Sequence, residues 1–136
     1  MKLFIALLVV LNSFSALAFT EIITQRDFKI ERVQNADAYI SKYKFEKGAD
    51  RCELMFIANG KTTSGIIPKS TVFNGIYVEM NECYYDLLKT CKLGLSAFND
   101  AEDLELNLTC WNRGLFSREI DLKLVNQILS EILIIQ

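Results

Sequence analysis

The stretch LELNLTC, residues 104–110, alternates apolar and polar side chains at every position. Successive side chains of a strand point to opposite faces, so a strand here would carry Leu104, Leu106, Leu108 and Cys110 on one face. We therefore predict a strand whose even-numbered side chains face the core. A polar turn at residues 99–102 precedes it, and residues 95–98 are predicted to form the other strand of a hairpin.

Period-two patterns also mark the first half of the chain. Residues 39–46 and 52–58 alternate in the same way, which predicts two further strands. The dipeptide Asn59-Gly60 favours a tight hairpin turn and predicts a return strand over residues 61–67. A second Asn-Gly pair, Asn74-Gly75, lies inside an apolar run and predicts either another turn or a β-bulge.

Two segments are predicted to be helical. Residues 81–94 begin with the capping residue Asn81, end at Gly94 and carry apolar and cysteine side chains at helical spacing. From Val125 to Leu133 an amphipathic stripe predicts a short C-terminal helix, with a last strand as the alternative. The expected fold class is α+β: a small strand-rich antiparallel sheet or partly open barrel with one mid-chain helix and one C-terminal helix.

Residues 1–18 have the pattern of a signal peptide. Lys2 precedes an apolar run over residues 3–11, and small residues near the end predict cleavage before Phe19. The apolar run is half the length of about 20 residues that a membrane span needs. The expected organisation is a signal peptide followed by one domain over residues 19–136, exported to the periplasm or the extracellular space. We expect no transmembrane segment in the mature chain.

The four cysteines are Cys52, Cys83, Cys91 and Cys110. An even number in an exported domain predicts two disulfides, and the spacing lacks the close pairs of a structural zinc site. A helix over residues 81–94 would hold Cys83 and Cys91 about 12 Å apart, too far for a bond. The hairpin register then favours Cys91–Cys110 with Cys52–Cys83. If residues 81–94 form a hairpin instead, Cys83–Cys91 with Cys52–Cys110 is expected.

The chain contains no histidine. This removes the commonest general base and the usual ligand of catalytic zinc, so we expect binding rather than catalysis, and no cofactor or metal. Lys2 is the only charged residue in the first 18, so the remaining chain carries 14 basic and 17 acidic residues, a net charge of −3. This mildly acidic balance argues against a nucleic-acid partner.

An acidic run contains Asp100, Glu102, Asp103 and Glu105. Carboxylates of this kind bind calcium in some loops, but the run lacks the glycine-centred spacing of an EF-hand. Two acids facing across a cleft are also the machinery of a glycosidase. We interpret the run as a solvated turn and keep a carboxylate-based hydrolase as an alternative function.

The predicted ligand-binding residues are Trp111, Asn112 and Arg113. If the even positions face the core, Trp111 faces outward at a strand end beside two polar side chains, and surfaces of this kind bind sugars or proteins. The alternative is that the C-terminal helix, or a neighbouring copy of the chain, covers the tryptophan.

The predicted order of several strands, one helix and further strands is similar to that of the OB-fold B subunits of bacterial toxins. The resemblance covers element order only and implies a carbohydrate-binding subunit that assembles into rings. The expected function is an exported, disulfide-bonded, non-enzymatic binding protein, with a protein or glycan partner. Carbohydrate binding and hydrolysis are the alternatives.

Overall fold

The computed structural model of this chain describes residues 19–32, 38–59, 65–85, 87–115 and 117–136. The predicted signal peptide lies outside these residues, and so does Gly60 of the predicted hairpin turn. Within the described ranges, no helix combines the length and the apolar composition that crossing a bilayer requires.

The described chain forms ten strands and one helix. In chain order these are β1 (Glu21–Thr24), β2 (Phe28–Lys29), β3 (Glu31–Arg32), β4 (Ala38–Lys47), β5 (Asp50–Asn59), β6 (Ile66–Ile67), β7 (Val72–Tyr85), β8 (Lys89–Asn99), β9 (Leu104–Gly114), α2 (Leu122–Leu129) and β10 (Leu133–Ile135).

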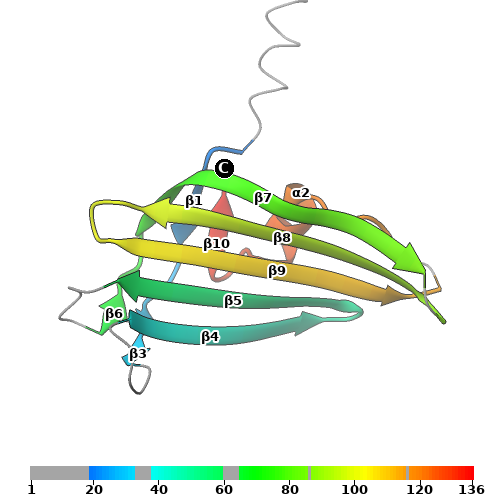
Figure 1. Ribbon diagram of the computed structural model, residues 1–136, viewed down its shortest axis with the longest axis horizontal. Helices are drawn as coiled ribbons and strands as arrows, with labels where there is room; N and C mark the ends of the chain where they lie inside the picture. The colour runs from blue at the N-terminus through cyan, green and yellow to red at the C-terminus, as the bar shows by residue number, and fades with distance from the viewer. Residues whose placement is uncertain (1–18, 33–37, 60–64, 86, 116) are drawn as a thin grey trace, which may run out of the picture.

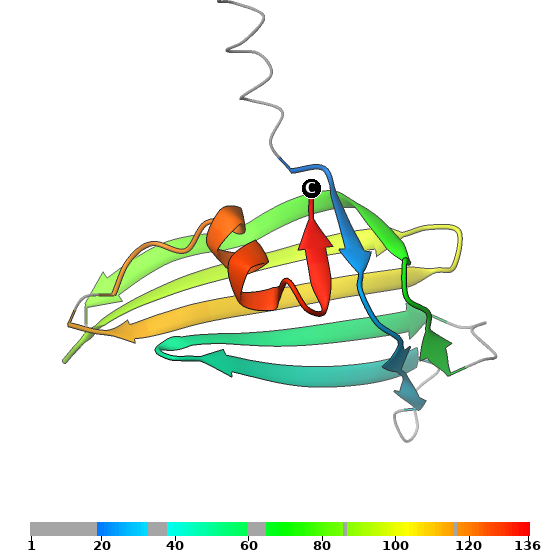
Figure 2. The same ribbon diagram turned by 180° about the vertical axis from the view of Figure 1, so that it is seen from behind.

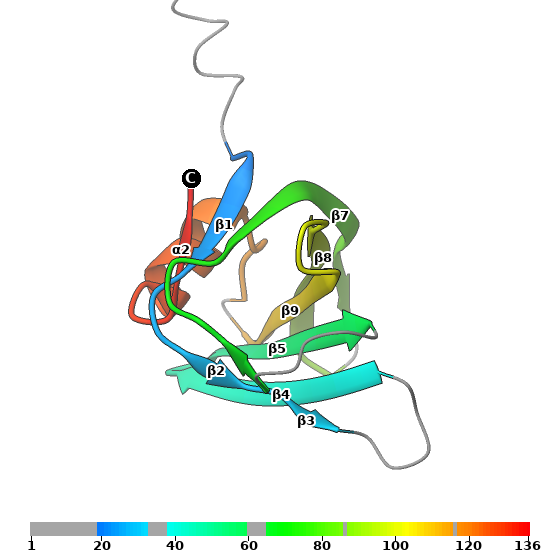
Figure 3. The same ribbon diagram turned by 90° about the vertical axis from the view of Figure 1, so that its left-hand side faces the viewer.

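Eight of the strands form one antiparallel sheet in the order β10-β1-β7-β8-β9-β5-β4-β3 (Figure 1). The sheet curls into a half-barrel, which Figure 3 shows from one end of the molecule. At one end of the sheet β1 and β10 curl over, so that they and the helix α2 lie in front of the concave side of the long strands (Figure 2), and the short pair β2–β6 forms a second sheet. We call the concave side the inner face and the opposite side the outer face.

The hydrophobic core fills the inner face. Phe28 of β2 packs its ring against Phe56 of β5 and Tyr43 of β4, with ring centroids 4.9 Å and 5.0 Å apart. Val125 and Leu129 of α2 are buried over the middle of the sheet. Burying large apolar side chains from several segments is the main favourable term for a domain of this size.

The predicted phase of β9 is confirmed. Leu104, Leu106, Leu108 and Cys110 are all buried, and the residues between them are half-buried or exposed on the outer face. Strict alternation specified the face of this strand because only one side of it meets the core.

The predicted helix over residues 81–94 is wrong. This segment forms the end of β7, a turn and the start of β8, and the two strands pair from Met80–Gly94 to Tyr85–Lys89. Leu87, which fell on the predicted apolar helix face, is 89% exposed at the turn. The strand β8 lies between β7 and β9, and pairing on both edges outweighs the weak helix propensity. The α+β class with two helices is therefore wrong: the fold is an antiparallel sheet with one helix.

The resemblance to OB-fold toxin subunits is wrong for the same reason, because the resemblance depended on a helix between two groups of strands. The chain instead continues directly from β7 into β8 and β9 as a meander. Residues 61–64 of the return strand predicted after β5 lie outside the described residues. The described part, β6, pairs with β2 and not with β5, which pairs with β4 and β9.

The C-terminal prediction is right for the helix and wrong for its end. The helix α2 begins after Asp121, whose carboxylate accepts a hydrogen bond from the backbone N–H of Leu124 at 2.8 Å. The chain leaves the helix at Ser130 and ends in β10, which pairs with β1. Leu133 and Ile135 are buried and Ile134 is half-buried, so the last residues follow the period of a strand.

The favoured disulfide pairing is wrong, and the pairing expected for a hairpin is the one formed. Cys52 is bonded to Cys110, and Cys83 to Cys91. The turn between β8 and β9 places Asn99 opposite Leu104, two positions further than the sequence suggested. Cys91 therefore faces Asn112 instead of Cys110. A shift of two residues preserves the face of every side chain but changes its partner.

Candidate functional site

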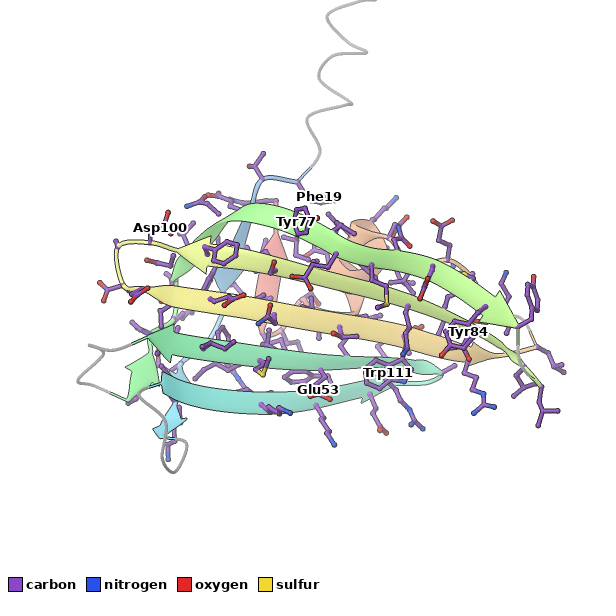
Figure 4. All side chains as sticks on the ribbon, in the orientation of Figure 1. Phe19, Glu53, Tyr77, Tyr84, Asp100 and Trp111 are labelled. Carbon is purple, nitrogen blue, oxygen red and sulfur yellow. A yellow bond between two sulfur atoms is a disulfide. The ribbon has the colours of Figure 1, made fainter. Side chains whose placement is uncertain are left out.

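The three predicted ligand-binding residues do not share a surface. Trp111 is half-buried on the outer face, between Arg51 of β5 and Lys92 of β8 in the ladder, and Figure 4 shows it on that face. Asn112 points inward and is buried, while Arg113 is exposed on the outer face. Alternation along β9 thus separates Asn112 from its two neighbours.

The side chain of Asn112 bonds to its own chain. Its amide donates to the backbone oxygen of Arg118 at 3.0 Å and to Asp50 Oδ1 at 3.4 Å, and the Ser117 hydroxyl donates to its Oδ1. These bonds tie the segment that leads into α2 to the end of β9. A surface pocket of about 360 Å³ lies there, lined by Asn112 and Arg113 among others, but Trp111 does not line it.

The acidic run lies at the opposite end of the sheet. Asp100, Glu102 and Asp103 are exposed in the β8–β9 turn, and Glu105 is half-buried on the outer face of β9. A second pocket, of about 420 Å³, is lined at this end by Asp100 and by the ring of Phe98. Asp100 is the only acid among the residues that line it, and within the described ranges no three metal-ligating side chains form a group.

Exposed apolar side chains gather on β7. Five of the nine large apolar side chains that are exposed in the described residues belong to this strand, with exposed fractions between 40% and 79%. We call them the β7 strip: Tyr77, Val78, Met80, Tyr84 and Tyr85. Figure 4 shows Tyr77 and Tyr84 on the outer face, and Met80 shares that face by alternation, whereas Val78 and Tyr85 are in the phase of Cys83 and lie on the other face of the strand. Exposed apolar side chains that gather on one strand of a folded domain mark interaction surfaces more often than scattered ones do.

The β7 strip lies beside an open sheet edge. The strand β1 pairs with β7 only at residues 72–74, where Ile22 lies opposite Phe73. Past Asn74, no strand within the described ranges pairs with that edge of β7, which is bonded on its other side to β8. Two register irregularities, at residues 75–76 and at Glu79, interrupt the ladder with β8, so the prediction at Asn74-Gly75 is settled as a bulge.

Sequence reasoning missed this surface because it placed residues 81–94 in a helix. A helix would have put Tyr84 and Tyr85 on the flanks of an isolated element. The available signal was composition: residues 76–85 contain three tyrosines, a valine and a methionine, with Glu79 and Glu82 the only charged residues. Tyrosine and methionine are enriched at protein interfaces.

The fold and this surface define a class of protein in structural terms. It is a disulfide-bonded half-barrel of antiparallel strands with one open, apolar edge. Comparisons of the chain with protein-family models, with curated proteins and with solved structures found no match.

Proposed function

We propose that this protein is an exported, non-enzymatic interaction protein that binds a partner protein through the β7 strip. The observation that carries the proposal is the concentration of exposed tyrosine and other large apolar side chains on one strand. Tyrosine combines a large apolar surface with a polar hydroxyl and few rotatable bonds, so it loses little entropy on binding.

Export is supported by the two disulfides and by the predicted signal peptide. Disulfides such as Cys52–Cys110 and Cys83–Cys91 persist in oxidising compartments and are rare where thiols are kept reduced. A partner in the periplasm or outside the cell is therefore the class to search.

Site-specific crosslinking tests the proposed function. A photo-crosslinking phenylalanine analogue is introduced at Tyr85 of the full chain in its native host, and a matched position is Lys44, which is exposed on the outer face of β4. We expect one discrete crosslinked protein from position 85 and none from position 44. Equal crosslinking at both positions, or none at position 85, contradicts a docking surface on β7.

A second candidate function is carbohydrate binding at the pocket beside Phe98. This ring is 39% exposed, and Asn74 and Asp100 line the same pocket. An aromatic ring with polar neighbours is a common arrangement for binding a sugar. Glycan-array binding that is lost in Phe98→Ala and kept in Trp111→Ala would support this candidate, and an array without binding would remove it.

A further inference from the structure

The open edge of β7 has a regular part. From Met80 to Tyr85 each residue faces one residue of β8 without a shift, over six consecutive pairs. Six residues is a usual length for a strand. Apart from the ladder with β8, the described residues make no backbone–backbone hydrogen bond to this segment.

The disulfide reveals which backbone groups point to this open edge. In an antiparallel pair, opposed residues that do not exchange hydrogen bonds have Cα atoms about 4.5 Å apart, against about 5.5 Å for those that do. The Cα atoms of Cys83 and Cys91 are 4.0 Å apart, so Cys83 does not bond to β8 through its backbone. Its N–H and C=O therefore point to the open edge. Alternation assigns the same direction to Asn81 and Tyr85.

Three residues thus present their backbone donors and acceptors outward at every second position. An extended chain lying antiparallel to β7 matches this spacing and pairs with all of them. An open edge of this kind, bordered by apolar side chains, is a template for strand addition. Met80 and Tyr84, the strip residues of this segment on the outer face, would then contact alternate side chains of the added strand.

Charge distinguishes the possible occupants. Residues 76–85 contain Glu79 and Glu82 and no lysine or arginine. Glu79 accepts a hydrogen bond from the Ser96 hydroxyl at 3.1 Å, and Glu82 is exposed on the outer face between Met80 and Tyr84. Lys92 lies opposite Glu82 in the ladder, but its ammonium is placed over the Tyr84 ring, 5.9 Å from the centroid.

A second copy of this chain fits the edge poorly. Pairing two β7 strands antiparallel about the centre of this segment brings the two Glu82 side chains to opposite or diagonal positions, where like charges repel. A lysine or arginine on the added strand, facing Glu82, has a favourable interaction instead.

We infer that the partner adds a strand to β7 along residues 80–85, as an extended segment with lysine or arginine facing Glu82. This inference rests on the proposed function and names the partner's binding mode and chemistry. The partner's backbone pairs with Asn81, Cys83 and Tyr85, and its apolar side chains contact Met80 and Tyr84.

A displayed library of random linear ten-residue peptides, selected on the disulfide-intact protein, tests the inference. We expect the selected peptides to carry a basic residue with an apolar residue two positions before it and another two positions after it, and to lose about tenfold or more in affinity for Glu82→Lys. Methylating each peptide amide nitrogen in turn should weaken binding about tenfold at every second position and little in between, because only alternate amides face β7.

Two variants of Asn81 provide a matched comparison. Asn81→Pro removes the outward N–H but no hydrogen bond to β8, and it should weaken the selected peptides about tenfold. Asn81→Ala removes only the exposed side chain and should bind within about threefold of the native chain. The methylation scan uses the native protein, so it decides the question even if the proline variant fails to fold.

The remaining outcomes overturn the inference. These are a library without binders that respond to Glu82→Lys, a uniform methylation scan, and a stable dimer of the native chain that Asn81→Pro dissociates. If the Tyr85 crosslink captures a partner whose binding survives Asn81→Pro, strand addition is wrong and the proposed function stands. If position 85 captures nothing, the proposed function itself is wrong.

Discussion

Cys83 and Cys91 stand directly opposite each other across β7 and β8, with their Cα atoms 4.0 Å apart. This pair fixes the register of the hairpin near its turn, on the inner face of the sheet. It also fixes which residues of β7 point their backbone N–H and C=O groups to the open edge. The exposed tyrosines and the open edge are therefore held in place by a covalent bond between neighbouring strands.

The disulfide pairing gives the first prediction. Proteolysis of unreduced protein should release one peptide pair joined through Cys52 and Cys110 and another joined through Cys83 and Cys91, because each pair is directly opposed in the sheet. Mass spectrometry of the digest before and after reduction measures this. A peptide that links Cys91 to Cys110 would mean that Cys91 lies opposite Cys110 and not opposite Asn112, a register shift of two residues between β8 and β9.

The two disulfides should contribute unequally to stability. Cys52 and Cys110 are 58 residues apart, and constraining a loop of that length stabilises the fold by about 4 kcal/mol. Cys83 and Cys91 are 8 residues apart, for which the same relation gives about 2.5 kcal/mol. Urea unfolding of the two double alanine variants compares them. A larger loss for the Cys83–Cys91 variant would contradict the assignment.

Phe56 is the residue whose truncation should damage the core most clearly. It is fully buried and packs against the rings of Phe28 and Phe73. Phe56→Ala should lower the free energy of unfolding by about 3–5 kcal/mol. The matched control is Met55→Ala on the outer face of the same strand, with an expected loss below about 1 kcal/mol. Similar losses in urea unfolding would contradict the assignment of faces.

The β7 strip should contribute to binding but not to folding. Tyr77 and Tyr85 are 64% and 79% exposed, so Tyr77→Ser and Tyr85→Ser should change the free energy of unfolding by less than about 0.5 kcal/mol. The same substitutions should reduce capture of the crosslinked partner through a probe at position 84. Marked destabilisation by either would show that the tyrosine packs within the fold.

Alternation predicted the faces of the strands but not their partners. The phase of β9 followed from Leu104 to Cys110 because one face of that strand is buried. The register did not follow, because it depends on the turn, where Asp103 takes a positive φ of 53°. The turn lies one residue later in the chain than predicted, which left every face correct and moved Cys110 from opposite Cys91 to opposite Leu93.

The helix prediction failed where local and long-range preferences disagree. Residues 81–94 carry a cap, a terminal glycine and a helical spacing of cysteines, but β8 gains pairing on both edges from β7 and β9. The candidate site was hidden by the same error. Trp111 was placed correctly on the outer face, whereas the exposed edge of β7 depends on β1 ending its pairing at Asn74, which no local pattern reports.

Backbone amide hydrogen exchange along β7 separates the amides that face the open edge from those that are bonded to β8. In the free protein, the amides of Met80, Glu82 and Tyr84 bond to β8 and should exchange slowly, while those of Asn81, Cys83 and Tyr85 face the open edge and should exchange fast. Residue-resolved NMR of the disulfide-intact chain measures all six. Uniform protection would mean that another segment covers the edge, and the reverse alternation would mean that the partner-binding groups assigned here point to β8.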